Sequence, residues 1–505
     1  MNTWPHPMAR LRELRLLPGN REAWQARRDL IAQARQQLDL AYFILEDDTS
    51  SNALLDDLQA AAARGVQVRL LADHLMVWPH AAMLQARAMD GLQIRLYRPP
   101  AAAWLAQLQQ VGIDAQRFLV GLSGADTGLL LQSLAGCSLV PAAWVAQLRE
   151  IAQAPTQLRL AHALQVLARL QQLAGDAPAP PAYAGLAQLQ AIVKGLGAYL
   201  HRSHHKLLLA DQRRFIMGGR NLADAYHRSD GTHAPPFRDL DLQACDSRAR
   251  CEEHAAAFEA LWALGQDVRA LDAPTVSPAA RAVATPPACV AGTFDQPAHP
   301  LPDLDGCIVN SLPGSATQAA VTEAYTACIR RFTARGAPGA IDIVSAYLFL
   351  DDVPARSSTL AALRQSLLDA AAVDGITVNL YTNSLASTDL KPVNAAFYQC
   401  MGALIAGGVR VHELRPGHGS LHAKAAAVGD DCLLVGSYNF DPRSELYDSN
   451  NLAVLHDPGG QATAAWRALW TAPDLWTPVT AEAAAQLQAQ TEPDALRYAL
   501  LSRLL

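Results

Sequence analysis

The sequence AYFILEDD at residues 41–48 returns as AYLFLDD at residues 346–352. An Ala-rich helical stretch and then a β-branched run follow each copy, ending at Asp73 in the first case and at Asn383 in the second. Both copies therefore predict the order strand, helix, strand. That order is typical of α/β units with largely parallel strands, and we expect one sheet in each half of the chain.

Two further matches continue the repeat in the same order. GLQIRLYRP at residues 91–99 corresponds to GGVRVHELRP at 407–416, and FEALW at 258–262 corresponds to WRALW at 466–470. Matches that keep their order along the chain indicate an internal duplication. The aromatic pairs of the last match lie one helical turn apart, which favours a packed closing helix in each half.

The repeat defines the expected domain organisation. We predict a first repeat at residues 1–267, a linker rich in Pro and Ala at 268–303, a second repeat at 304–480 and a C-terminal helix at 481–505. The first repeat holds an insertion at residues 100–200, whose apolar residues recur at helical spacing and whose charged residues are sparse. Two interpretations stay open, a buried helical subdomain and a lid or lipid-facing segment.

Each half also carries a His-x-Lys motif. His204 precedes Lys206 by two positions, and His422 precedes Lys424 by two positions. In a strand, residues two apart point to the same face, so each half offers one imidazole beside one ammonium group. A glycine-led turn follows each motif, and we expect it to bind phosphate through four residues: Gly219, Asn221, Ser437 and Asn439.

Two such sets suit displacement at a phosphodiester. The reaction needs a nucleophile, an acid for the leaving oxygen, and positive charge on the non-bridging oxygens. Two histidines, two lysines and two glycine turns supply all three, so we expect neither a metal nor another cofactor. A metal site at the neighbouring His201, His204 and His205 is set aside, because this spacing on a strand rarely gives a suitable geometry.

These motifs resemble the phospholipase D superfamily, whose mark is a duplicated HxKxxxxD followed by G-[GS]-x-N. GGRNLADAY at 218–226, FRDLDL at 237–242, TNSLASTD at 382–389 and GSYNFDPRS at 436–444 are most similar to bacterial cardiolipin synthases of the C type. The resemblance implies two phospholipase D-like repeats forming a pseudo-two-fold bilobal monomer, with an all-helical insertion in the first. It also implies a metal-independent phosphohistidine mechanism.

The resemblance assigns roles to individual residues. His204 is expected to be the nucleophile, with Asp211 as the motif aspartate and Asp239 as the carboxylate that orients it, and His422 is expected to be the general acid. The second half departs from the family pattern twice, with Gly429 at the motif aspartate position and Asn450 where a glutamate is usual. An amide holds an imidazole by a hydrogen bond but does not stabilise imidazolium as a carboxylate does.

Composition narrows the function classes. The net charge is -6, so the chain lacks the overall basic character of most nucleic-acid binders. The eight cysteines form no CxxC pair, which favours reduced thiols and a cytoplasmic protein. We see no run long enough to span a bilayer, so membrane contact is expected to be peripheral, on the inner membrane.

We therefore predict a phosphatidyltransferase or phospholipase D acting on glycerophospholipids, most similar to cardiolipin synthase. Two alternatives are a nuclease or phosphodiesterase of the same superfamily and a catalytically weakened lipid-binding protein.

Overall fold

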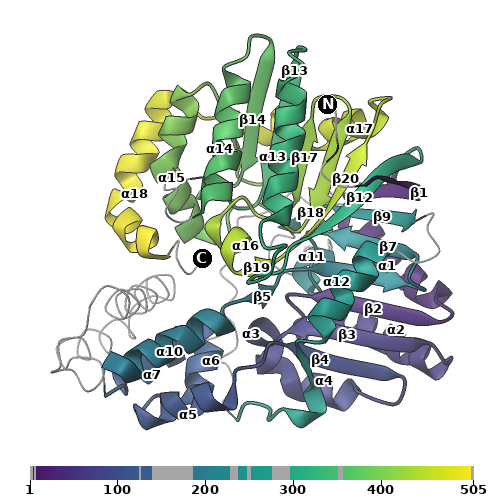
Figure 1. The fold of residues 1–505 in the computed structure, drawn as a ribbon, viewed down its shortest axis with the longest axis vertical. Helices are drawn as coiled ribbons and strands as arrows, with labels where there is room; N and C mark the ends of the chain where they lie inside the picture. The colour runs from purple at the N-terminus through teal and green to yellow at the C-terminus, as the bar shows by residue number, and fades with distance from the viewer. Residues whose placement is uncertain are drawn as a thin grey trace.

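The computed structural model describes residue 4 and residues 7–123, 127–138, 186–227, 237–246, 252–275, 296–350 and 357–501. Strands and helices alternate through both halves, and helices pack on the faces of a large mixed sheet (Figure 1). This is the mixed α/β architecture that the alternating sequence pattern predicts.

Three parallel strands form the centre of each half. In the first half they are β2 (Gln37–Tyr42), β3 (Gln67–Asp73) and β4 (Leu92–Tyr97). In the second half they are β13 (Gly339–Ser345), β14 (Ile376–Thr382) and β15 (Arg410–Leu414). The helices α2 (Thr49–Ala63) and α14 (Ser358–Ala371) provide the first crossovers. The order strand, helix, strand is thus confirmed in both repeats.

The His-x-Lys strands add antiparallel hairpins to these cores. In the first half β6 (Lys206–Ala210) pairs with β2 and with β7 (Arg214–Gly218), which pairs with β9 (Asp241–Asp246). In the second half β17 (Lys424–Val428) pairs with β13 and with β18 (Cys432–Gly436), which pairs with β20 (Asn451–His456). More pairs are antiparallel than the sequence pattern indicates, because strands joined by a tight turn can only run antiparallel.

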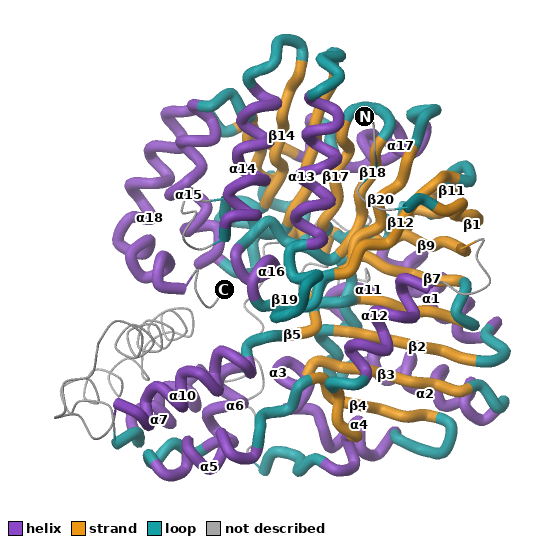
Figure 2. Tube along the Cα trace, viewed as in Figure 1, coloured by secondary structure: helices purple, strands orange, loops and turns teal. Residues whose placement is uncertain are grey.

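One strand joins the two halves. β1 (Ala9–Leu17) pairs antiparallel with β9 of the first half and, through Ala9–Leu11, with β12 (Leu304–Asn310) of the second. β12 in turn pairs with β20. The expected separate sheets are therefore linked into one ladder of strands, which Figure 2 shows running through both lobes.

Strand register corrects one part of the repeat alignment. Tyr42 of β2 lies opposite Lys206, whereas Ser345 of β13 lies opposite Lys424. Tyr42 therefore corresponds to Ser345, and Tyr347 corresponds to Ile44. The Ala-Tyr pairs at 41–42 and 346–347 are therefore not structurally equivalent, and the sequence match is offset by two residues from the match set by strand pairing. Similar apolar residues at both strand ends allow sequences to be aligned in either way, whereas the backbone pairing has one register.

The described part of the insertion is helical and packs into the core. It contains α5 (Ala102–Gln110), α6 (Ala115–Leu122), α7 (Thr127–Ala135) and α10 (Leu186–Tyr199). Trp104, Phe118 and Tyr199 belong to the same buried apolar cluster as Leu75 beyond β3. The described helices therefore fit the buried-subdomain interpretation, and residues 139–185 lie outside the described residues.

The expected closing helices are α12 (Glu252–Trp262) and α17 (Gln461–Trp470), and their aromatic residues are buried as expected. The C-terminal helix α18 (Ala481–Leu501) lies beside α15 (Lys391–Ala406) in Figure 1. Most of the expected linker, residues 276–295, lies outside the described residues, so the domain boundaries stay predictions. Among the described helices, none is both long and apolar enough to cross a bilayer.

Apart from four two-residue strands near the histidines, the remaining described elements are α1 (Asn20–Gln33), α3 (His74–Val77), η1 (Trp78–His80), α4 (Ala81–Arg87), α11 (Asp224–His227), β10 (Gly265–Asp267), η2 (Val268–Ala270), β11 (His299–Pro300), α13 (Ala320–Thr333), α16 (Pro442–Leu446), η3 (Pro473–Leu475) and β21 (Trp476–Pro478).

Candidate active site

The two His-x-Lys motifs lie where β6 and β17 begin. Both histidines are 5 % exposed and both lysines are fully buried. Each lysine turns its ammonium group back onto the carbonyl of its own histidine, with Lys206 Nζ donating to His204 O over 2.9 Å and Lys424 Nζ donating to His422 O. Lys424 Nζ also lies 3.0 Å from His422 Nδ1, and the ring of Phe43 lies beside both His204 and Lys206 Nζ, so each pair shares one side of its strand, as the spacing predicts.

Two short strand pairs bring the halves together at this point. β5 (Arg202–Ser203), just before His204, pairs in parallel with β19 (Asp448–Ser449) of the second half. β16 (Ser420–Leu421), just before His422, pairs in parallel with β8 (Phe237–Arg238) of the first half. The next residue on each partner strand is then Asn450 and Asp239, respectively. Each histidine is therefore set opposite a residue from the other half.

Asp239 orients His422 and not His204. Its Oδ2 lies 2.7 Å from His422 Nδ1, and its Oδ1 accepts the backbone N–H of Leu240 over 2.7 Å. The expectation that Asp239 serves His204 is therefore wrong, because the β16–β8 pairing carries this carboxylate across the pseudo-two-fold axis. Gly219 makes room for it, since a Cβ at that position would approach the Asp239 carboxylate to 2.0 Å.

Asn450 orients His204. Its Oδ1 lies 3.1 Å from His204 Nδ1, while its Nδ2 donates to the carbonyls of Ser444 and Asp448 over 2.9 and 3.1 Å. Because the amide N–H groups are committed to those carbonyls, the oxygen must face the imidazole. The hydrogen of His204 is then fixed on Nδ1, which leaves a lone pair on Nε2. The departure from the family pattern thus gives the two histidines chemically different partners.

Burial and charge favour the neutral form of both imidazoles. The pKa of His204 lies well below its ordinary value because of burial and the charges of Lys206 and Lys424. The pKa of His422 is also lowered by burial and by Lys424, but the charge of Asp239 opposes the shift. Burial lowers the pKa of Lys424 to about 8, against the opposing charge of Asp239. His422 is therefore the histidine with a built-in counterion.

The residues expected to bind phosphate make contacts that hold the site together. Asn221 accepts the Ile44 N–H on its Oδ1 over 3.1 Å and donates from Nδ2 to Tyr226 Oη over 3.0 Å. Ser437 Oγ donates to Asn450 Oδ1 over 3.1 Å. Asn439, which is 5 % exposed, has a side-chain oxygen without a hydrogen-bond partner among the described residues. Phosphate binding by Gly219, Asn221, Ser437 and Asn439 stays a prediction.

The motif aspartate has a structural position. Asp211 lies at the far end of β6 from His204, and its carboxylate accepts the backbone N–H groups of Arg35, Gln36 and Gln37 over 2.7–3.2 Å. Its predicted catalytic role is therefore corrected to a clamp on the start of β2. In the second half Arg467 stabilises the same turn by donating to the carbonyl of Gly429 over 2.9 Å. Gly429 therefore lies at the end of β17 away from His422, and the absence of an aspartate there does not change the contacts of the histidines.

Sequence reasoning missed an aromatic and acidic group around His422. Tyr226 Oη lies 3.5 Å from His422 Nε2, and the two rings meet edge to face at 5.1 Å. Tyr347 Oη donates to both carboxylate oxygens of Asp389 over 2.8 and 3.0 Å. Tyr226 and Asp389 fall inside two motifs that define the family resemblance, GGRNLADAY and TNSLASTD. Their place inside these motifs was the signal in the sequence that could have identified Tyr226 and Asp389 as site residues.

Arg443, which follows the Gly-Ser turn, pairs with Asp448. Its Nε lies 3.3 Å from Asp448 Oδ2, whereas Glu445 accepts from Thr322 and Thr359.

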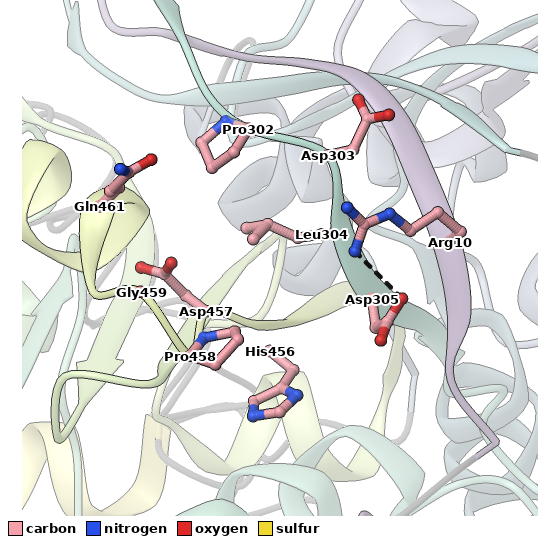
Figure 3. Close-up of a pocket in the computed structure, with 10 residues that line it drawn as sticks. All are labelled: Arg10, Pro302, Asp303, Leu304, Asp305, His456, Asp457, Pro458, Gly459 and Gln461. Carbon is pink, nitrogen blue, oxygen red and sulfur yellow. Dashed lines mark hydrogen bonds and ion pairs between the residues drawn. The ribbon is translucent and has the colours of Figure 1, made fainter.

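Elsewhere, a surface cavity of about 250 Å³ lies between β1, β12 and the end of β20 (Figure 3). Arg10 and Asp305 form an ion pair across its wall, and none of its ten lining residues belongs to the two motifs.

Comparisons with known proteins find similar sequences along most of the chain. A family model described as "Cardiolipin synthase, PLD-like domain" matches residues 28–121 and 335–470. Cardiolipin synthase C of Escherichia coli is 24% identical, with 88% of this chain and 84% of that protein covered. Cardiolipin synthase A of Pseudomonas entomophila is 25% identical over 48% of this chain and 42% of its own.

A solved structure shares the fold. Phosphatidylserine synthase of Haemophilus influenzae has a TM-score of 0.57 at 12% identity, with 98% of this chain and 97% of that chain covered. The duplicated halves, the paired histidines and lysines at their junction, and these similarities lead to one conclusion. The chain is similar to proteins with a phospholipase D-like domain, the cardiolipin synthases among them.

Proposed function

We propose that this protein is a phosphatidyltransferase or phospholipase D that cleaves a glycerophospholipid phosphodiester through a phosphohistidine on His204. One observation carries the proposal: the two buried histidines have different partners, an amide at His204 and a carboxylate at His422. An amide holds an imidazole while leaving it neutral, and a neutral imidazole is the nucleophilic form. A carboxylate stabilises the imidazolium that a general acid requires.

The mechanism follows from these partners. Nε2 of His204 attacks phosphorus and forms an N–P bond, while the P–O bond to the head-group alcohol breaks and His422 gives that oxygen a proton. The entering phosphodiester is an anion, so its charge offsets the lysines and raises the pKa of His422 when substrate binds. A second alcohol, or water, then gives its proton to His422 and attacks phosphorus, which releases His204.

The two lysines supply the positive charge. Lys206 and Lys424 are buried beside the histidines, where a cation acts on the non-bridging oxygens with little screening. Charge that forms on these oxygens in the transition state is therefore stabilised by groups already in place.

A phospholipid is the proposed substrate because the similar proteins are named as cardiolipin synthases and a phosphatidylserine synthase. A peripheral position on the cytoplasmic face of the inner membrane is proposed with it, and co-sedimentation with anionic vesicles tests that part. The nuclease alternative has less support, given the net charge of -6. The weakened-enzyme alternative loses one of its two motivations, since Gly429 lies away from the histidines.

The test is incubation with phosphatidylglycerol, phosphatidylethanolamine and a short-chain phosphatidylcholine, followed by mass spectrometry of the products. Release of a head group or formation of a new phosphodiester supports the proposal, and the ratio of the two separates hydrolysis from transfer. Acid-quenched peptide mapping should find phosphate on the peptide that contains His204. A label on the His422 peptide would reverse the assignment.

A further inference from the structure

The surroundings of the two histidines differ in polarity. On one side the ring of Phe43 meets His204 edge to face at 5.0 Å, with Lys206 Nζ 5.2 Å from the same ring. The residue after Phe43 is Ile44, so this strand end contributes no hydroxyl group at these two positions. On the other side, the position equivalent to Ile44 is Tyr347, and two rings lie beside His422, Phe237 at 5.0 Å and Tyr226 at 5.1 Å.

The polar side carries hydroxyl groups and one carboxylate. Tyr226 Oη accepts the Asn221 amide hydrogen, so its own hydrogen is available within 3.5 Å of His422 Nε2. Tyr347 Oη donates to the carboxylate of Asp389. Asp389 is exposed to solvent, whereas Tyr226 is buried. Ser345 lies opposite Lys424 in the antiparallel β13–β17 pair, so the same register sets Tyr347, two residues further on, opposite His422, and Asp389 is bonded to Tyr347.

We propose that Tyr226, Tyr347 and Asp389 form the subsite for the alcohol that leaves from, or enters at, His422. This inference rests on the proposed function, in which His422 protonates the leaving alcohol and deprotonates the entering one. Both alcohols must then occupy the space next to His422 Nε2, which Tyr226 borders. The side at Phe43 is then left for the phosphatidyl part.

The chemistry of the subsite selects the alcohol. An ionised carboxylate only accepts hydrogen bonds, and the Tyr347 hydroxyl leaves several of its acceptor positions unused. The favoured alcohol therefore carries a second donor near its reacting hydroxyl, either another hydroxyl, as in glycerol, or an ammonium, as in ethanolamine. Choline has the positive charge of ethanolamine without an N–H donor, so it discriminates donation from charge alone.

The experiment measures binding of three water-soluble diesters by calorimetry: glycerophosphoglycerol, glycerophosphoethanolamine and glycerophosphocholine. It uses the full chain, both as wild type and as His204→Gln, which cannot form phosphohistidine. We expect the first two ligands to bind about fivefold more tightly than the choline diester, as one charge-assisted hydrogen bond in a partly exposed site allows. The preference between glycerol and ethanolamine distinguishes hydroxyl from ammonium as the donor.

Asp389→Asn should reduce this preference to about twofold or less, and Tyr347→Phe should weaken it. The control is Asp374→Asn, an exposed aspartate before β14 at the opposite end of that strand from Asp389, which should keep the preference. Equal binding of all three diesters, or an unchanged preference in Asp389→Asn, would refute the subsite. If the preference is found but phospholipids are not turned over, the proposed function fails and the subsite stands.

Discussion

Replacing Asp239 by Asn tests the division of labour between the histidines. Asp239 is fully buried, with Oδ1 held by the Leu240 N–H and Oδ2 facing His422 Nδ1. In Asp239→Asn the amide oxygen keeps the Leu240 hydrogen bond, so Nδ2 points at the imidazole and donates to Nδ1. His422 is then restricted to the neutral tautomer with its hydrogen on Nε2, which is a poor acid.

The size of the effect depends on the leaving group. A phosphodiester of an alkyl alcohol needs a proton on its departing oxygen, so we expect its kcat to fall by about 10²- to 10⁴-fold. The nitrophenolate of a nitrophenyl phosphodiester leaves without that proton, so the rate of its release in a single turnover should fall by less than about tenfold. The assay therefore compares leaving-group release from both substrates in single turnovers of wild type and of Asp239→Asn, because the second step needs His422 as a base whichever group has left.

A matched control is Asp457→Asn, which alters another buried carboxylate. Asp457 accepts from Thr463 beyond the other end of β20 from Asn450, so its replacement should affect the two substrates equally. Equal and large losses on both substrates in Asp239→Asn would mean that His422 is the nucleophile. The roles of the two histidines would then be exchanged, with the carboxylate of Asp239 orienting the nucleophile and the amide of Asn450 orienting the general acid.

Three further outcomes are expected. Asp211→Ala should lower the free energy of unfolding by about 1–3 kcal/mol, because three backbone N–H groups lose their acceptor, while kcat stays within twofold; a loss of kcat with unchanged melting would contradict the clamp assignment. Incubation with EDTA should leave turnover intact, because Lys206 and Lys424 supply the charge; activity lost on chelation and restored by a divalent ion would refute this. Burial lowers the pKa of His74, His205 and His254 to about 3, so between about pH 6.5 and 3 the unfolded chain binds more protons than the native one. The free energy of unfolding should therefore decrease as the pH is lowered, by about 1.4 kcal/mol per pH unit for each histidine. Denaturant titrations at several pH values should show a shallower dependence on pH for His254→Phe than for wild type.

Much of the fold could be predicted because its signals are local. A His-x-Lys on a strand puts both side chains on one face whatever the rest of the chain does. The β-branched runs ending at Asp73 and Asn383 form the second parallel strand of each half, as expected. Asp73 is the last residue of β3, and Asn383 directly follows β14. Buried closing helices also followed from the spacing of their aromatic residues.

The partners of the histidines could not be derived in this way. Asn450 reaches His204 across 246 positions and Asp239 reaches His422 across 183, each through a two-residue strand pair that has no periodic signal. The sequence by itself determined which side chains carry the chemistry and that there are two sets of them. Only the tertiary structure decided which acceptor faces which imidazole, because that choice depends on backbone pairing between the halves and not on the order of residues along either one.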